Sequence, residues 1–209
     1  MTRKSKNEIE VLLVDLGGVL FEHNQALQKT AKEFGVSIKK IIRIVKRDSK
    51  IREIDGKPID ECWRVLFKDI GEDIDIPAFQ DKYHKNHPIN EELFSLLRSY
   101  KKNGMKFALV TNNIKGHLKN LNGVYEFYDI FDWIFDSSEM GIRKPNRKYY
   151  EEVYKGVGVE KSRCLFIDDT EEHIRVAKKF GYKTFHFIDF KESTKELERF
   201  LRNAGITRS

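Results

Sequence analysis

The stretch that decides the fold of this 209-residue chain is Val11-Leu12-Leu13-Val14-Asp15-Leu16-Gly17-Gly18-Val19-Leu20. Four apolar residues run into an aspartate, and such a short unbroken run predicts a strand buried on both faces of a parallel sheet. Asp15 then falls at the carboxyl end of the strand, the edge at which open α/β sheets bind ligands. Gly17 and Gly18 allow the backbone to turn there and to approach a bound group closely. The same residues also fit a strand that ends in an ordinary Asp-x-Gly turn. Other parts of the chain are needed to distinguish a ligand site from such a turn.

Strand-like and helix-like segments alternate from residue 90 onward. Short apolar runs predict strands at residues 106–110, 132–135, 164–167 and 183–187. Helical spacing predicts helices at residues 90–102, after residue 113, and at residues 146–155, 171–180 and 193–203. Strands that alternate with helices imply right-handed crossovers between parallel strands. The expected fold class is therefore α/β, a Rossmann-like parallel sheet flanked by helices.

An all-helical insertion separates the first strand from this α/β region. Apolar residues recur at helical spacing over residues 24–47, where Gly35 divides two helices and Ser37 can cap the second. Residues 54–58 read as a turn, residues 59–70 as an amphipathic helix, and Pro77 opens one more helix. No strand pattern occurs between residues 24 and 90. We therefore expect two domains, an α/β core of residues 1–22 and 90–209 and a helical domain of residues 23–89.

The composition limits the class of protein. Hydrophobic residues make up 40% and charged residues 34%, which is typical of a globular chain. No apolar run approaches the roughly 20 residues that span a bilayer, and no signal-peptide segment follows the basic N-terminus. We therefore expect a cytoplasmic protein without a membrane partner, in which Cys62 and Cys164 are buried free thiols. The net charge of +6 is spread over interleaved basic and acidic residues, which argues against nucleic acid as a partner.

Polar residues follow two further apolar runs. Thr111 and Asn112 follow the expected strand at residues 106–110, and Asp168 and Asp169 follow the one at residues 164–167. Because parallel strands end at the same edge of a sheet, these residues are expected to meet Asp15. Carboxylates gathered without compensation raise one another's pKa, and a divalent cation relieves their repulsion. Oxygen-only ligands favour Mg²⁺, so the pattern predicts a magnesium site.

At these residues the sequence resembles the haloacid dehalogenase-like (HAD) superfamily of phosphatases. Counterparts of its four motifs occur in order between residue 11 and about residue 181. They are Asp15-Leu16-Gly17-Gly18-Val19-Leu20, Val110-Thr111-Asn112, Lys144-Pro145 followed by Tyr149-Tyr150, and Phe166-Ile167-Asp168-Asp169. Each motif is weak alone, whereas four in the right order are specific. The helical insertion looks like the family's cap domain, and its Glu53…Gly56…Ile59 stretch is similar to such caps.

The resemblance implies a nucleophile and a metal site. Asp15 would attack phosphorus and form an aspartyl-phosphate, as carboxylate nucleophiles can. Mg²⁺ would be bound by the Asp15 carboxylate, the backbone carbonyl of Gly17, and Asp168, with Asp169 close by. The implied activity is that of a Mg²⁺-dependent phosphatase acting on a small phosphorylated metabolite, with sugar phosphates among the candidates. The protein is expected to be a monomer or a homodimer.

The resemblance also implies groups that hold the phosphate. Thr111 would donate a hydrogen bond to a phosphoryl oxygen, helped by the amide of Asn112. Lys144 would neutralise charge on both the nucleophile and the phosphate. Gly18 and Arg143 are further candidates for contact with the substrate. The cap would close over this site and select the substrate.

Gly17 departs from the family pattern. The family's phosphatases usually carry a second aspartate at this position, which protonates the leaving group and later activates water. General acid–base catalysis is worth roughly 10²–10⁴ in rate, so the loss is large. The six histidines show no metal-ligand spacing, and the two near residue 85 are expected at the surface of the cap. The candidate replacements for the missing acid are Glu22, His23, His84 and His87.

Three functions stay open from the sequence. The first is a phosphatase for substrates whose leaving group needs little protonation, such as anomeric sugar, aryl or acyl phosphates. The second is a catalytically weak relative that binds a phosphorylated ligand or a protein partner. The third is a haloacid dehalogenase, against which the adjacent pair Asp168-Asp169 argues, because those enzymes work without a metal.

Overall fold

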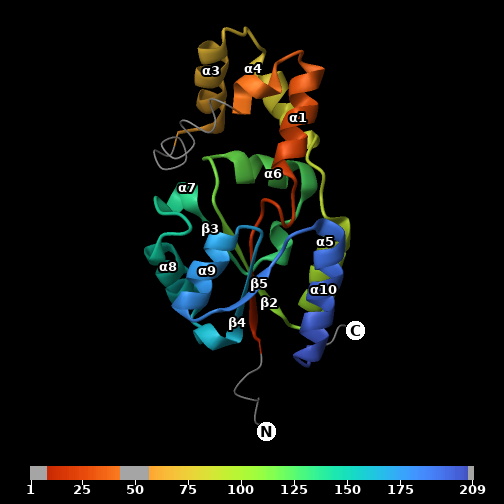
Figure 1. Cartoon of the computed structure of the whole chain (residues 1–209), viewed down its shortest axis with the longest axis vertical. Helices are drawn as coiled ribbons and strands as arrows, with labels where there is room; N and C mark the ends of the chain where they lie inside the picture. Colours follow the sequence, from red (N-terminus) through yellow and green to blue (C-terminus); the bar gives the residue numbers. More distant parts are fainter. Residues whose placement is uncertain (1–8, 43–56, 207–209) are drawn as a thin grey trace.

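One parallel sheet of five strands forms the centre of the computed structural model, which describes residues 9–42 and 57–206 (Figure 1). The strands are β1 (Val11–Val14), β2 (Lys106–Thr111), β3 (Trp133–Asp136), β4 (Cys164–Asp168) and β5 (Lys183–His186). Their order across the sheet is β3-β2-β1-β4-β5, with every neighbouring pair parallel. The expected α/β class with a parallel sheet is confirmed, and β1 is its central strand.

Both faces of β1 are buried, as its unbroken apolar sequence predicts. Leu12 and Val14 face one hydrophobic cluster, while Val11 and Leu13 face the other. The first cluster is completed by residues of α5 (Glu91–Lys102), α6 (His117–Tyr125) and α10 (Phe190–Asn203). The second is completed by residues of α8 (Arg147–Val157) and α9 (Glu171–Phe180). Helices therefore cover the sheet on both sides.

The insertion after β1 is helical where the structure describes it. Its helices α1 (His23–Glu33), α3 (Ile59–Ile70) and α4 (Ile76–Lys85) gather at the end of the molecule toward which β1 runs (Figure 1). They share a third hydrophobic cluster, in which Trp63, Phe67 and Phe79 pack ring against ring. Between residues 24–42 and 57–90 there is no named strand. The domain boundaries at residues 22–23 and 89–90 stay a prediction.

Gly35 separates two helical segments, as expected. It has φ +67°, α1 ends before it, and residues 38–42 are helical after it. The rest of that second helix, most of the expected turn at residues 54–58, and the Glu53…Gly56 part of the cap-like stretch lie outside the described residues. Cys62 and Cys164 are buried and free, which confirms the expectation for both. Within residues 9–42 and 57–206, no helix is both long and apolar enough to cross a membrane.

Some boundaries differ from the expectation. Helix α10 begins at Phe190 rather than near residue 193, because the Asp189 carboxylate accepts hydrogen bonds from the amides of Lys191 and Glu192 at 2.9 Å each. A short helix, α7 (Ser137–Met140), follows β3 directly and was not expected. Asp136 caps it by accepting from the amide of Ser138 at 2.9 Å. Two single 3₁₀ turns, η1 (Tyr128–Ile130) and η2 (Lys161–Arg163), precede β3 and β4.

Candidate active site

The ends of two adjacent strands, β1 and β4, bring the acidic residues together. Val14 is paired with Ile167, so that Asp15 and Asp168 follow on adjacent strands, and the Asp15 amide donates to the Ile167 carbonyl at 2.9 Å. Carboxylate oxygens of Asp15, Asp168 and Asp169 all lie within 4.8 Å of one another. The register of the sheet therefore creates the expected acidic cluster.

Lys144 lies in the middle of this cluster with its ammonium group fully buried. Its Nζ is 2.8 Å from Asp15 Oδ1 and 2.6 Å from Asp168 Oδ2, and it donates to the Val110 carbonyl at 2.9 Å. Burial lowers the pKa of Lys144, but the two carboxylates outweigh burial and the net pKa is raised. The lysine therefore stays charged and uses its three donors on three fixed acceptors.

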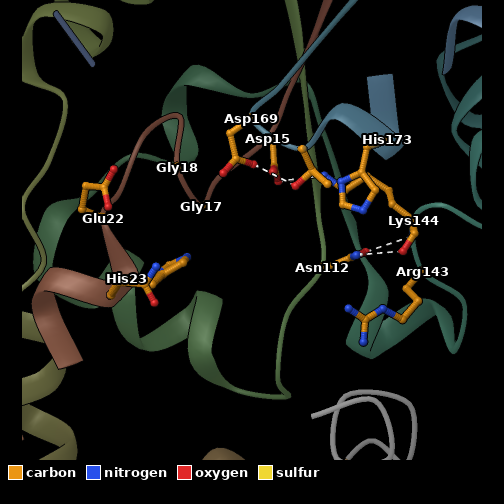
Figure 2. Close-up of a pocket in the computed structure, with 12 residues that line it drawn as sticks. Asp15, Gly17, Gly18, Glu22, His23, Asn112, Arg143, Lys144, Asp169 and His173 are labelled. Carbon is orange, nitrogen blue, oxygen red and sulfur yellow. Dashed lines mark hydrogen bonds and ion pairs between the residues drawn. The ribbon is translucent and has the colours of Figure 1, made fainter. Parts of the chain in front are cut away.

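Asn112 holds the segment that carries Lys144. Its side-chain amide donates to the Lys144 carbonyl at 3.0 Å, and its side-chain oxygen accepts from the Lys144 amide at 3.0 Å (Figure 2). The sequence predicts only a role for the Asn112 amide at the phosphate. Its side chain fixes a loop that lies 32 residues further along the chain, a contact that no local pattern reveals.

His173 is a member of the site that the sequence did not indicate. Asp168 Oδ1 accepts from the Thr170 amide at 2.9 Å and lies 3.0 Å from Nδ1 of His173, in the first turn of α9. Burial raises the pKa of Asp168, but Lys144 and His173 outweigh it and bring the pKa to about 2. Asp168 is therefore ionised at neutral pH. One feature of the sequence could have indicated this role, because His173 lies at the start of the helix that directly follows the acidic pair.

A cavity of about 470 Å³ opens over these groups (Figure 2). Thr111 and Asp168 are buried outside its lining, and the candidate acids His84 and His87 also lie elsewhere. The expectation that these two histidines lie at the surface is wrong, because they are only 3% and 4% exposed. The cavity is lined by Asp15, Gly17, Gly18, Glu22, His23, Asn24, Asn112, Arg143, Lys144, Asp169, Thr170 and His173.

The sequence matches a known family over most of its length. The family described as haloacid dehalogenase-like hydrolase matches residues 12–187. The chain belongs to this family. Among curated relatives of this HAD-like hydrolase, the sesquiterpene phosphatase astK of Aspergillus oryzae is 29% identical over 190 residues, covering 90% of this chain and 94% of the relative. A phosphoglycolate phosphatase of Aquifex aeolicus is 24% identical over 184 residues, covering 84% and 83%.

Solved structures show the same fold. A HAD-like family hydrolase from Porphyromonas gingivalis superposes with a TM-score of 0.73 at 22% identity, covering 93% of this chain and 98% of that one. A HAD family enzyme from Bacteroides thetaiotaomicron, solved in complex with magnesium and inorganic phosphate, gives a TM-score of 0.68 at 21% identity, covering 85% and 93%.

The charge balance of this HAD-like site fits a divalent cation. Three carboxylates surround one ammonium group. Burial raises the pKa of Asp15 to about 8; Lys144 opposes this, while Asp168 and Asp169 add to it. Burial and Asp168 also raise the pKa of Asp169. The lysine alone therefore leaves negative charge uncompensated, and an all-oxygen donor set is the one that Mg²⁺ prefers.

The two glycines of the first motif leave no room for side chains. Gly18 has φ +71°, and a Cβ there would lie 2.1 Å from Asp169 Oδ2. Only glycine therefore lets the backbone come this close to the acidic cluster. At Gly17 a Cβ would lie 2.8 Å from Cδ2 and 2.9 Å from Nε2 of His23. The His23 ring therefore fills the space of the side chain that this hydrolase lacks at residue 17.

Proposed function

We propose that this chain is a Mg²⁺-dependent phosphatase that hydrolyses a small phosphorylated metabolite through an aspartyl-phosphate on Asp15. The observation that carries the proposal is the arrangement around the Asp15 carboxylate. Within the described residues, both donors to it, the Leu16 amide at 2.7 Å and Lys144 at 2.8 Å, act on Oδ1. Oδ2 is then the oxygen left to attack phosphorus, on a residue that lines the cavity.

Mg²⁺ would be held by Asp15, the Gly17 carbonyl, Asp168 and Asp169, and its charge would offset that of the carboxylates and of a bound phosphate. The acidic cluster supports this assignment, since its oxygens lie within 4.8 Å of one another. A solved relative of the same fold also holds magnesium and phosphate together.

Lys144 would neutralise negative charge on both Asp15 and the transferring phosphoryl group. Asn112 would keep the lysine in place. Thr111, the amide of Asn112, Gly18 and Arg143 are the remaining proposed phosphate contacts. Most of the catalysis would then be positioning and electrostatics, as is general for phosphoryl transfer. The helical insertion would act as the cap that selects the substrate.

The absence of a carboxylate at Gly17 narrows the substrate class. Without that acid, the preferred substrates have leaving groups that depart with little protonation, such as anomeric sugar, aryl or acyl phosphates. Because one relative is a sesquiterpene phosphatase, sesquiterpene phosphates belong in the same panel. The cytoplasmic location and the monomeric or homodimeric state stay predictions.

The test is hydrolysis of p-nitrophenyl phosphate and of this panel, with and without Mg²⁺. Asp15→Asn should abolish turnover, whereas Asp129→Asn, at an aspartate whose side chain is 68% exposed, is the matched control that keeps it. No turnover across the panel by a folded protein would overturn the proposal. Thermal stabilisation by phosphate without turnover would then favour the ligand-binding alternative, and Mg²⁺-independent chloride release from a 2-haloacid would favour a dehalogenase.

A further inference from the structure

Four of the six histidines gather where the helical insertion meets the core. His23 begins α1, His84 lies in the last turn of α4, His87 follows that helix, and His117 begins α6. Ring centroids of His23, His87 and His117 are 5.0–5.5 Å apart pairwise, and His84 lies 5.1 Å from His117. His23 also lines the cavity of the proposed phosphatase site, but the proposed chemistry assigns no role to any of these side chains.

The hydrogen bonds of this histidine cluster fix which nitrogen carries each proton. Nδ1 of His84 lies 2.7 Å from the Gln80 carbonyl, and Nδ1 of His87 lies 2.8 Å from the Tyr83 carbonyl. Carbonyl oxygens only accept, so both Nδ1 atoms carry a proton, and in the neutral ring each Nε2 keeps a lone pair.

The two lone pairs face the other two histidines of the cluster. Nε2 of His87 is 2.9 Å from Nδ1 of His23, and Nε2 of His84 is 3.1 Å from Nδ1 of His117. In the metal-free protein His23 and His117 therefore donate from Nδ1. Each neutral ring then carries one proton.

His87 has the usual form of a metal-binding histidine, a neutral imidazole whose other nitrogen donates to a backbone carbonyl. Ligand nitrogens of His23, His87 and His117 all lie within 4.8 Å of one another. Zn–N bonds of about 2.0–2.1 Å place tetrahedral ligand nitrogens about 3.3 Å apart. The 2.9 Å contact between His87 Nε2 and His23 Nδ1 therefore needs to widen only by a few tenths of an ångström.

The environment favours a neutral, metal-competent cluster. Burial lowers the pKa of His87 to about 4. Burial likewise lowers the pKa of His84 and His117. Protons therefore do not compete with a metal at neutral pH, since metal ligands must be deprotonated.

We propose that His23, His87 and His117 form a second metal site, separate from the acidic cluster, that binds Zn²⁺ or a similar transition metal. His84 orients His117 by accepting its Nδ1 proton. Binding through Nδ1 of His23 moves the proton of that ring to its Nε2, so no proton is released. Imidazole ligands select Zn²⁺ over Mg²⁺, which prefers oxygen. Because the ligands come from α1, the segment after α4, and α6, a bound ion ties the helical insertion to the core.

The test uses the full chain, stripped with a chelator and supplied with excess Mg²⁺, which leaves the acidic cluster occupied by a hard cation. Co²⁺ serves as the spectroscopic probe, and Zn²⁺ as the competitor. We expect one equivalent of Co²⁺ to give visible absorption bands of a low-coordinate nitrogen site, Zn²⁺ to bleach them, and Zn²⁺ to raise the melting temperature. Asp169→Asn should retain all of these responses, because it alters only the acidic cluster.

Matched variants locate the site. His87→Gln and His117→Asn should each weaken binding by roughly 100-fold or more, and His84→Gln by about 10–100-fold, as expected for a residue that orients a ligand. His186→Gln, at a histidine outside the cluster, should bind like the wild type. Absence of the Co²⁺ bands in the wild type overturns the proposal whatever the variants do, and so does wild-type affinity in a folded His87→Gln protein. Neither readout depends on phosphatase turnover, so failure of one proposal leaves the other standing.

Discussion

Replacing Gly17 by alanine tests whether the His23 ring occupies the place of a side chain at residue 17. Gly17 is not among the glycines with positive φ, so its backbone accepts alanine without strain. The new Cβ would lie 2.8 Å from His23 Cδ2, closer than non-bonded carbons approach. The ring cannot simply swing away, because its Nδ1 is 2.9 Å from His87 Nε2 and it packs 5.2 Å from the His117 ring. Overpacking of this kind costs about 1–3 kcal/mol, which is the destabilisation expected for Gly17→Ala.

A double-mutant cycle isolates this contact. His23→Ala alone should cost about 1–3 kcal/mol, because it removes a hydrogen bond and a partly buried ring. In the double variant Gly17→Ala/His23→Ala the new methyl group has room, so the combined cost should be at least about 1 kcal/mol below the sum of the single costs.

The assay is urea unfolding of the chelator-treated protein, followed by tryptophan fluorescence. Gly123→Ala is the matched control, because that glycine lies in α6 and a Cβ there meets nothing within 4 Å. This control should be neutral or slightly stabilising in both backgrounds. If the costs of Gly17→Ala and His23→Ala add to within about 0.5 kcal/mol, the reasoning from the Cβ position is refuted.

The same pair of positions tests the missing acid. Gly17→Asp alone should lower turnover, because the new side chain collides with His23. With His23→Ala in addition, the carboxylate has space at the position where the family's phosphatases carry it, and turnover of alkyl phosphates should rise by up to about 100-fold. Turnover of p-nitrophenyl phosphate, whose leaving group needs no proton, should change little. An equal rise for both substrate types would contradict an acid role for this position.

Three further outcomes follow from the site. Lys144→Met leaves buried carboxylates without their cation, so unfolding should become easier by about 3–5 kcal/mol in urea titrations, with turnover lost. Gly18→Ala pushes a methyl group to 2.1 Å from Asp169 Oδ2 and should raise the Mg²⁺ concentration for half-maximal turnover, measured by Mg²⁺ titration, by roughly tenfold or more. Burial lowers the pKa of His23 to about 3 and of His87 to about 4, so both stay neutral in the fold while the unfolded chain takes up protons below about pH 6.5. The contribution of His87 to the stability of the metal-free protein should therefore fall by about 1.4 kcal/mol between pH 7.5 and 5.5. The difference in free energy of unfolding between the wild type and His87→Gln, measured in urea, should change by that amount, and a difference that stays constant would contradict this.

The sequence predicts best what depends on short-range pattern. The buried run Val11–Val14, the alternation of strands and helices, and the placement of Asp15 and Asp168 at strand ends follow from periodicity and from the geometry of parallel sheets. Helix starts are predicted less well, because a cap such as Asp189 shifts the first residue of α10 without changing the apolar spacing. The role of Lys144 in the third motif follows from the family resemblance, because no pattern in the sequence places this lysine beside two carboxylates.

Contacts between distant segments could not be predicted. The Asn112 side chain hydrogen-bonds to the backbone of Lys144, and His173 lies against Asp168. Neither contact can be predicted from the spacing of residues in the sequence. The histidines show the same limit, since His87 meets His23 across the insertion, and His84 meets His117 where α4 packs on α6. A surface position was the natural expectation for polar residues near the end of an amphipathic helix, and tertiary packing overrode it.

The register of the sheet fixes the relative positions of the side chains in the acidic cluster. Asp15 and Asp168 follow Val14 and Ile167, which are paired across β1 and β4, and the pairs Val11↔Cys164 to Val14↔Ile167 are buried on both faces. Side chains alternate between the faces of a strand, so a slip of one residue would turn Asp168 away from Lys144 and exchange the two apolar layers at once. Because such a slip carries a hydrophobic penalty, the burial of these apolar side chains also keeps Asp168 next to Lys144. In this chain the residues that fold the core and the residues that place the nucleophile are consecutive in the sequence, and the same hydrogen-bond ladder serves both.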